Sequence, residues 1–311
     1  MNDGTRADPE EPSQAGVRSR WHRPRVRVSV RWLMILVLIL GIGLGWVAHR
    51  ARVQRMAVRA ILARGGMVEY DYQYDASRDR RLPQGRSWWP AWLRSTLGDD
   101  YLHEIVRAGF DRVATDEDMA ALARLPRLKA IHIGGCRVTD AGVGRLRGLT
   151  GLRMLILWGN PIRGEGLRQL RSLKDLRYLD LDHTLVTDEG LDGLADLTGL
   201  ERLDATNNPQ LSGEFLRHVA GLPRLKDLVL RNSGITDTAL AHLARVKAVR
   251  SLMLDGTRVS DAGLAHLRGL TGLRSLDLSE TAVSGDGVMR VQEWFPQAGL
   301  KPSLPARAQM N

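Results

Sequence analysis

The sequence has little cysteine and few aromatic residues. Its 311 residues include one cysteine, Cys136, and aromatic side chains make up 5% of the chain. A paired Cys-x-x-Cys site for metal or redox chemistry is therefore excluded. No candidate base is paired with Cys136, so we expect a structural thiol rather than a reactive one.

Motifs of common enzyme classes are also missing. The chain has no Walker loop and no His-Glu-x-x-His motif, and HEIVR at His103 lacks the second histidine. His242 and His266 both occur as Ala-His-Leu, 24 residues apart, which is typical of surface positions on repeated helices rather than of a metal pair. We expect no enzyme activity, no cofactor and no metal ion.

Positive charge is abundant, at a formal net +10, but it is concentrated at one end of the chain. Residues 1–66 hold twelve Arg and four acidic residues, so only +2 remains for the rest of the sequence. A nucleic-acid-binding domain would carry a basic patch on its folded part. The charge distribution therefore argues against a nucleic-acid partner.

The basic residues flank one long apolar run, WLMILVLILGIGLGWVA, from Trp32 to Ala48. As a helix it would be about 26 Å long, close to a ~30 Å hydrocarbon core once Arg31 and Arg50 reach the interfaces. We predict a transmembrane helix over 32–48 after a basic, disordered tail over 1–31. A cleavable signal peptide is the alternative, although the run is long for one and an arginine-rich segment follows it.

The orientation of this anchor is weakly encoded. Six arginines precede the run and five follow it, so the positive-inside rule gives little preference. We favour a single-pass protein with a cytoplasmic N-terminus and the remaining chain outside, because a short basic tail is the natural side to retain. Gly41 and Gly45 form a Gly-x-x-x-Gly pair that would support a weak homodimer, but glycine is also common in membrane helices.

A repeated pattern occupies most of the chain after residue 110. TDAGVGRLRGL at Thr139 and SDAGLAHLRGL at Ser260 are nearly identical, and related copies lie between them. An aliphatic residue precedes each copy, in steps of 24 residues with one step of 25, at Val138, Ile162, Val186, Leu211, Ile235, Val259 and Val283. A fixed period of this length with Leu-x-x-Leu-x-Leu inside it is typical of a solenoid.

The repeat, for example LRYLDLDHTLVTDEGLDGL from Leu176, resembles the leucine-rich repeat family. It is most similar to the subclass of ribonuclease inhibitor and of bacterial single-anchor leucine-rich repeat proteins, over roughly Leu122 to Val291. The resemblance implies an α/β solenoid with parallel strands on the concave face and short helices on the convex face. We place the repeats at 111–291.

Each repeat explains its own spelling. Leu179 and Leu181 alternate with polar or aromatic residues, so the leucines should face the core and the others the open side of a short strand. Pairs such as Thr187-Asp188 predict an N-cap and an acidic first turn for a short helix. A small residue follows each strand and should form a hydrogen-bonded ladder at Cys136, Asn160, Thr184, Asn208, Ser233, Thr257 and Thr281.

The segments beside the repeats differ in composition. Residues 49–110 predict a juxtamembrane helix that ends at Gly65-Gly66 and then a strand, MVEYDYQYD, with Val68 and three tyrosines on one face and Glu69 on the other. A solenoid leaves its first repeat uncovered, so we expect this aromatic segment to be a cap, with a ligand platform as the alternative. Residues 292–311, with Trp294 and Phe295, predict the opposite cap and a tail.

The open face of the strands is the candidate site. Neighbouring strands lie about 4.8 Å apart, so the aspartates there should form one acidic patch beside the aromatic residues. The candidate partner-binding residues are Trp158, Tyr178, Asp180, Asp182, Asp204, Asp227, Arg231 and Asp255. Tryptophan and tyrosine are preferred interface anchors, although a solvated sheet also needs polar residues.

These observations predict a membrane-anchored leucine-rich repeat protein that acts as a protein-protein interaction module. The acidic residues favour a basic protein as the partner. The alternative is a structural protein of the cell envelope that binds a glycan or another polymer.

Overall fold

The structure is a computed structural model that describes residues 30–75, 80–82 and 85–301. Residues 1–29 of the expected tail and residues 302–311 lie outside the described residues. The chain divides into two units at Trp46/Val47, and helix α1 (Val30–Ala63) runs from the first unit into the second. Each unit is described by itself below.

Helix α1 is one element where the sequence predicted two. Its first part exposes large apolar side chains such as Trp32 and Leu44, whereas Ala57 and Ile61 near its end are buried. The helix is continuous because good helix formers, mainly Ala and Arg, fill the stretch after Ala48 without Gly or Pro. By length and composition it can cross a membrane, although a signal sequence would meet the same criterion.

The second unit contains a ten-stranded sheet with the order β1-β4-β5-β6-β7-β8-β9-β10-β11-β12. Strand β1 is antiparallel to β4, and all later neighbours are parallel. The strands are β1 (Met67–Tyr70), β4 (Ile105–Asp111), β5 (Ala130–Gly134), β6 (Met154–Ile156), β7 (Tyr178–Asp180), β8 (Arg202–Asp204), β9 (Asp227–Val229), β10 (Ser251–Met253), β11 (Ser275–Asp277) and β12 (Gly299–Lys301).

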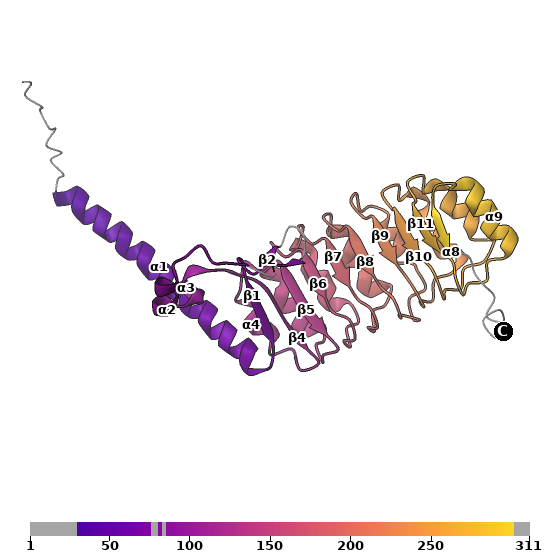
Figure 1. The fold of residues 1–311 in the computed structure, drawn as a ribbon. Coiled ribbons are helices and arrows are strands. Elements are labelled where there is room, and N and C mark those ends of the chain that lie inside the picture. The colour runs from indigo at the N-terminus through magenta and orange to yellow at the C-terminus, as the bar shows by residue number, and fades with distance from the viewer. Residues whose placement is uncertain (1–29, 76–79, 83–84, 302–311) are drawn as a thin grey trace, which may run out of the picture. The chain divides into compact units, whose positions relative to one another are not determined.

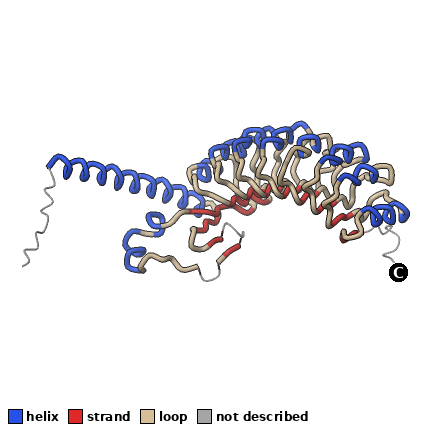
Figure 2. Tube along the Cα trace, turned by 90° about the horizontal axis from the view of Figure 1, so that it is seen from above, coloured by secondary structure: helices blue, strands red, loops and turns tan. Residues whose placement is uncertain are grey.

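Short helices cover the other side of the repeats, as Figure 2 shows for the helices in blue and the strands in red. They are α4 (Met119–Ala123), α5 (Asp140–Gly144), η1 (Arg145–Gly148), α6 (Glu165–Arg168), η2 (Gln169–Ser172), η3 (Glu189–Asp196), α7 (Leu216–Val219), α8 (Asp237–Leu240), η4 (Ala241–Arg245), η5 (Leu264–Gly269) and α9 (Gly285–Trp294). The repeats therefore form the leucine-rich repeat architecture expected from the sequence, with parallel strands on the concave side (Figure 1).

The core is a stack of identical layers. Leu179 of β7 pairs in register with Leu155 of β6 and Leu203 of β8, and all three side chains are fully buried. Leu191 and Leu194 of η3 close the layer from the helix side. Because no repeat can bury its apolar side alone, stability comes from the stacking of neighbours.

The ladder of small residues forms as expected. The Asn160 amide donates to the carbonyls of Ile133 and Leu157, at 2.8 and 2.9 Å. Cys136, which is buried, donates to the carbonyl of Gly134 at 3.4 Å, so its thiol occupies a structural position. These contacts satisfy carbonyls beyond the ends of the strands, where the sheet provides no partner.

The aspartates after each ladder position act differently from the prediction. Asp140 accepts hydrogen bonds from the backbone N–H groups of Arg163, Gly164 and Gly166, all in the next repeat. Asp188 binds the following repeat in the same way. The preceding Thr139 does cap its own helix, at Ala141. The carboxylates therefore connect repeats rather than cap their own helices, because the next loop presents its donors at that position.

The N-terminal cap consists of the end of α1, β1, the β2–β3 pair (Tyr74–Asp75 and Arg80–Arg81) and helices α2 (Ala91–Leu97) and α3 (Asp99–Leu102). The predicted nine-residue strand is wrong in its second half, because β1 ends at Tyr70 and a turn follows. Glu69, predicted on the solvated face, is only 3% exposed and pairs with Arg107 of β4. Antiparallel pairing with β4 buries the face that the alternation pattern assigned to water.

The sheet also extends beyond the predicted repeat boundaries. Its first parallel strand begins at Ile105, and its last, β12, follows α9 at the C-terminal end. Phe295 is buried there and Trp294 is half-buried. Both residues pack against the end of the core, which agrees with the expected C-terminal cap.

Candidate functional site

The strand face carries two adjacent hollows within the described part of the chain. The first, which we name the tyrosine hollow, has a volume of about 500 Å³ and is lined by residues that include Tyr74, Lys129, Arg153, Arg177 and Tyr178. The second, the acidic hollow, measures about 430 Å³ and is lined by residues that include Asp180, Asp182, Asp204 and Arg231. Arg202 and Asp227 line both, so the two hollows form one continuous surface.

The acidic hollow is built from neighbouring strands in register. Asp180 of β7 lies opposite Asp204 of β8, as the repeat period predicted. Asp180 accepts a hydrogen bond from the Tyr178 hydroxyl at 3.1 Å and one from the backbone N–H of Asp182 at 3.0 Å. Burial raises the pKa of Asp180, and the carboxylates of Asp204 and Asp182 raise it further. The hollow therefore holds like charges close together in a partly desolvated place.

The boundary between the hollows is an aromatic-cation pair. The Arg202 guanidinium lies 5.2 Å from the centre of the Tyr178 ring and 3.5 Å from an oxygen of Asp204. Burial raises the pKa of the Tyr178 hydroxyl, followed in effect by the charge of Asp180, so the hydroxyl stays a donor at neutral pH. Tyr178 is thus fixed in place, with one ring face covered by Arg202.

Arg231 and Asp255 form the end of the site nearest the C-terminus. The Arg231 Nε lies 3.1 Å from Asp255 Oδ1, and its Nη2 lies 3.9 Å from Asp277 Oδ2. Burial raises the pKa of Asp255, which Arg231 opposes and Asp277 supports. These charges largely compensate one another, so the uncompensated acid of the face is at Asp180, Asp182 and Asp204.

Trp158 is not part of the acidic patch where the sequence placed it. Its indole lies over Gly134 and Gly135, where an added Cβ on Gly134 would come within 2.3 Å of the ring nitrogen. The ring therefore points towards β5, on the side of β6 opposite to β7, and it lines neither hollow. Two glycines in the preceding repeat leave the space for it.

Sequence reasoning missed the basic side of the tyrosine hollow. Lys129, Arg153 and Arg177 precede the strand residues, outside the frame that was used to read the face. Tyr74 comes from the cap and is 4% exposed, with Arg107 over its ring at 5.4 Å. The signal was present, since the second position of the Leu-x-x-Leu frame is Lys or Arg in six of seven repeats.

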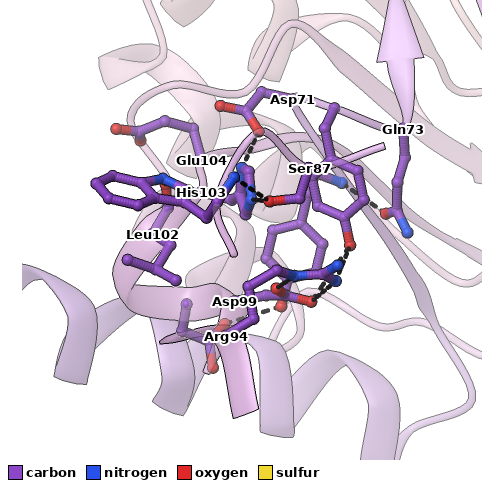
Figure 3. A network of polar contacts seen from close by, with 12 residues as sticks. Asp71, Gln73, Ser87, Arg94, Asp99, Leu102, His103 and Glu104 are labelled. Carbon is purple, nitrogen blue, oxygen red and sulfur yellow. Dashed lines mark hydrogen bonds and ion pairs between the residues drawn. The ribbon is translucent and has the colours of Figure 1, made fainter. Parts of the chain in front are cut away.

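A polar network fixes the cap segment that carries Tyr74. His103 accepts or donates at both ring nitrogens, with Ser87 Oγ at 2.7 Å from Nε2 and Asp71 Oδ1 at 2.7 Å from Nδ1 (Figure 3). The order Ser-His-Asp is that of a serine hydrolase. However, the His103 side chain is only 1% exposed and Tyr72 packs on it with ring centres 4.3 Å apart.

A leaving group bound at Ser87 could not reach the enclosed imidazole, which must protonate it in acyl transfer. The contacts therefore support a structural tie between three cap segments. The Gln54 amide of α1 adds a fourth connection, donating to the His103 carbonyl at 2.9 Å. The sequence gave no indication of this network, because its members lie far apart in the chain.

Comparison with known proteins supports the architecture. Residues 172–195 match a family model described as Leucine Rich repeat. The structure of internalin C2 from Listeria monocytogenes is similar, with 25% identity and a TM-score of 0.53, over 66% of this chain and 81% of that chain. The chain folds as a leucine-rich repeat protein. The ribonuclease-inhibitor-like subclass is not tested by these matches and stays a prediction.

Other leucine-rich repeat proteins match with lower scores. A protein from Leptospira interrogans shows 18% identity and a TM-score of 0.44, over 62% of this chain and 58% of that one. The plant peptide hormone receptor RGFR1, solved in complex with RGF2, shows 19% identity and a TM-score of 0.41, over 53% of this chain and 26% of that one. No curated protein sequence matches significantly.

Proposed function

We propose that this protein is a membrane-anchored leucine-rich repeat module that binds a protein partner on its strand face. The observation that carries the proposal is the continuous surface of the tyrosine and acidic hollows, centred on Tyr178, Arg202 and Asp227. The leucine-rich repeat fold supports a protein-binding role in general, and the apolar first part of α1 supports the anchor.

The side chains of this surface are preorganised. Tyr178 is held by Asp180 and Arg202, Asp204 accepts the Thr206 hydroxyl at 2.6 Å, and Asn207 donates to Asp182 at 2.9 Å. Side chains that are already ordered lose little conformational entropy when a partner binds. A polar face of this kind can therefore recognise a partner without a large apolar contact.

A glycan or polymer ligand fits this surface less well. Stacking on a sugar ring requires an open aromatic face. Tyr178 has one face under Arg202, and Trp158 lies against Gly134 and Gly135. A non-catalytic role follows from the same geometry, because the charged groups of the hollows are engaged with one another. We propose a cytoplasmic N-terminus with the repeats on the opposite side, and a weak homodimer through Gly41 and Gly45.

Site-specific photo-crosslinking in the full-length, membrane-embedded protein tests the proposal. A photoreactive amino acid at Asp227 should give a protease-sensitive adduct, whereas the same amino acid at the exposed Arg171 on η2 should not. The adduct at Asp227 should be lost when Arg202→Glu is added. Adducts of equal yield at both positions, or an adduct resistant to protease but sensitive to glycosidases, would refute a protein partner on this face.

A further inference from the structure

Charge on the strand face is separated into two sides. The residue before each strand forms a column that we name the entry row: Lys129, Arg153, Arg177, Glu201, Lys226, Arg250 and Arg274. Each N–H in this row donates to the carbonyl of the row member before it, at 2.7 or 2.8 Å. The row is therefore a continuous ladder of adjacent residues, with six cations and one acid along one edge of the sheet.

The aspartates lie on the other side of the face. Asp180, Asp204 and Asp277 occupy the last position of their strands, and Asp182 and Asp255 follow two residues later. Between the two sides lies a strip that is neutral or apolar, with Met154 and Ile156 on β6, Tyr178 on β7 and Val229 on β9. The separation is sharpest across β6, β7 and β8.

The distance between the sides identifies the shape of the ligand. Arg177 precedes Asp180 by three residues and Asp182 by five, which at about 3.3 Å per residue separates the charges by roughly 10 to 16 Å. An α-helix with its side chains is about 10 to 12 Å wide, whereas adjacent strands are only about 4.8 Å apart. A helix that lies along the column of strands would place its flanks over the two sides and its centre over the apolar strip.

We propose that the strand face binds an α-helix with one acidic flank and one basic flank. The inference rests on the proposed function and specifies its partner. The acidic flank faces the entry row around Arg153 and Arg177, and the basic flank faces Asp180, Asp182 and Asp204. This differs from the uniformly basic partner that the acidic residues alone suggest, because the entry row would repel such a partner.

The arrangement also sets the direction of the helix. Turning a helix end for end about an axis perpendicular to the face exchanges its flanks, so only one direction places acid over the entry row. A protein in which both sides are reversed should therefore bind the same helix in the opposite direction. Direction is a property that non-specific electrostatic attraction would not produce.

The test uses two synthetic helical peptides and the full-length protein in nanodiscs. Both peptides have a leucine strip and the same numbers of Glu and Lys, but one carries Glu on one flank and Lys on the other, while the second mixes them on both flanks. We expect the segregated peptide to bind at least tenfold more tightly, measured by fluorescence anisotropy. The advantage should disappear in Arg153→Glu/Arg177→Glu and persist in the helix-side control Arg171→Glu.

Reversal of both sides, by adding Asp180→Lys and Asp204→Lys, should restore the tenfold preference with opposite direction. Energy transfer from a donor at the peptide N-terminus to an acceptor at Gln297→Cys reports that direction. If the fourfold variant unfolds, the Arg177→Glu single variant, exposed in the wild type, gives the same comparison by a reduced preference. Equal affinity for both peptides, or a preference unchanged by the entry-row reversal, would overturn the inference while leaving the crosslinking result intact.

Discussion

At the scale of single residues, the strand face is a set of partly buried charges that fix one another. Asp180 is held by two hydrogen bonds, yet burial raises its pKa above the ordinary 3.8, because it is desolvated beside two other carboxylates. Its ionised form therefore costs stability in the folded state. Surfaces that bind partners often retain such unfavourable groups, since their charge is needed when the partner arrives.

Asp180→Asn should raise the thermal midpoint at pH 7 by about 2 °C, because the amide keeps the acceptor but removes the buried charge. The folded Asp180 binds a proton more readily than the unfolded one, so the wild type gains stability as the pH falls through the folded pKa towards 3.8. The difference between the two proteins should therefore shrink from pH 7 to pH 4. Thermal melts across this range, with the exposed Glu293→Gln as control, measure it. A difference that grows on acidification would contradict the assignment.

Two leucines in one repeat test the register of the strands. Leu179 is fully buried, and Leu185, six residues later, is 45% exposed. Leu179→Ala should lower the free energy of unfolding by about 2 to 5 kcal/mol, and Leu185→Ala by less than about 0.5 kcal/mol. Urea titration followed by circular dichroism gives both values. A silent Leu179→Ala would show that the strand is out of register by one residue.

The sequence predicted which residues share the face but not how each side chain lies there. Alternation with a period of two placed Asp180, Asp204 and the leucines correctly, since the pleat decides this locally. The position of Trp158 depends on Gly134 and Gly135 in the preceding repeat, and Arg202 covers Tyr178 from the following one. Contacts between repeats of this kind are not encoded within a single 24-residue unit.

At the scale of elements, the repeats and the cap follow different rules. Strands and helical turns in the repeats recur at fixed spacing, so their existence and order could be predicted. The cap has no repeat, and its strand β1 buries Glu69 because β4 and Arg107 supply the partner. Only the three-dimensional arrangement shows that α1 ends against the first repeat, where Arg64 pairs with Asp118 at 3.0 Å.

The turn after α1 is the most crowded part of the cap. A Cβ at Gly66 would lie 2.7 Å from Ile61 and 2.8 Å from the Gly109 carbonyl of β4, whereas one at Gly148 would meet nothing within 4 Å. Gly66→Ala should therefore destabilise the cap by about 1 to 3 kcal/mol. Gly148→Ala should be neutral or slightly stabilising. Hydrogen exchange of α1 and β1 locates the effect, and equal behaviour of the two variants would show that the cap does not pack at Gly66.

At the scale of the whole molecule, the anchor is a hydrophobic attachment and not an electrostatic one. The first part of α1 has a mean hydropathy of 2.2 over its most apolar window, with none of that window buried in the protein. Salt screens surface charge but leaves hydrophobic insertion intact. The full-length protein should therefore remain with membranes after washes in 1 M salt and in alkaline carbonate, at concentrations typical of such assays.

Deletion of residues 32–48 provides the matched control for this fractionation. The shortened protein keeps its basic tail and should leave the membrane in high salt, because its remaining attraction is screened. Release of the intact full-length chain by salt alone would refute the transmembrane anchor. A shortened product found only as a chain cleaved near Ala48 would instead identify the apolar segment as a signal peptide.

The ladder of backbone contacts from one repeat to the next also determines the order in which the chain can fold. Side-chain hydrogen bonds between repeats span 22 to 27 residues, and those that join α1 to the cap and first repeat span 46 to 54. A growing chain can therefore complete its cap soon after residue 118 leaves the ribosome or a translocation channel, and each further 24 residues add one finished layer. Synthesis from the N-terminus thus leaves a single growing end exposed at any time, and the last segment made, α9 with β12, covers it.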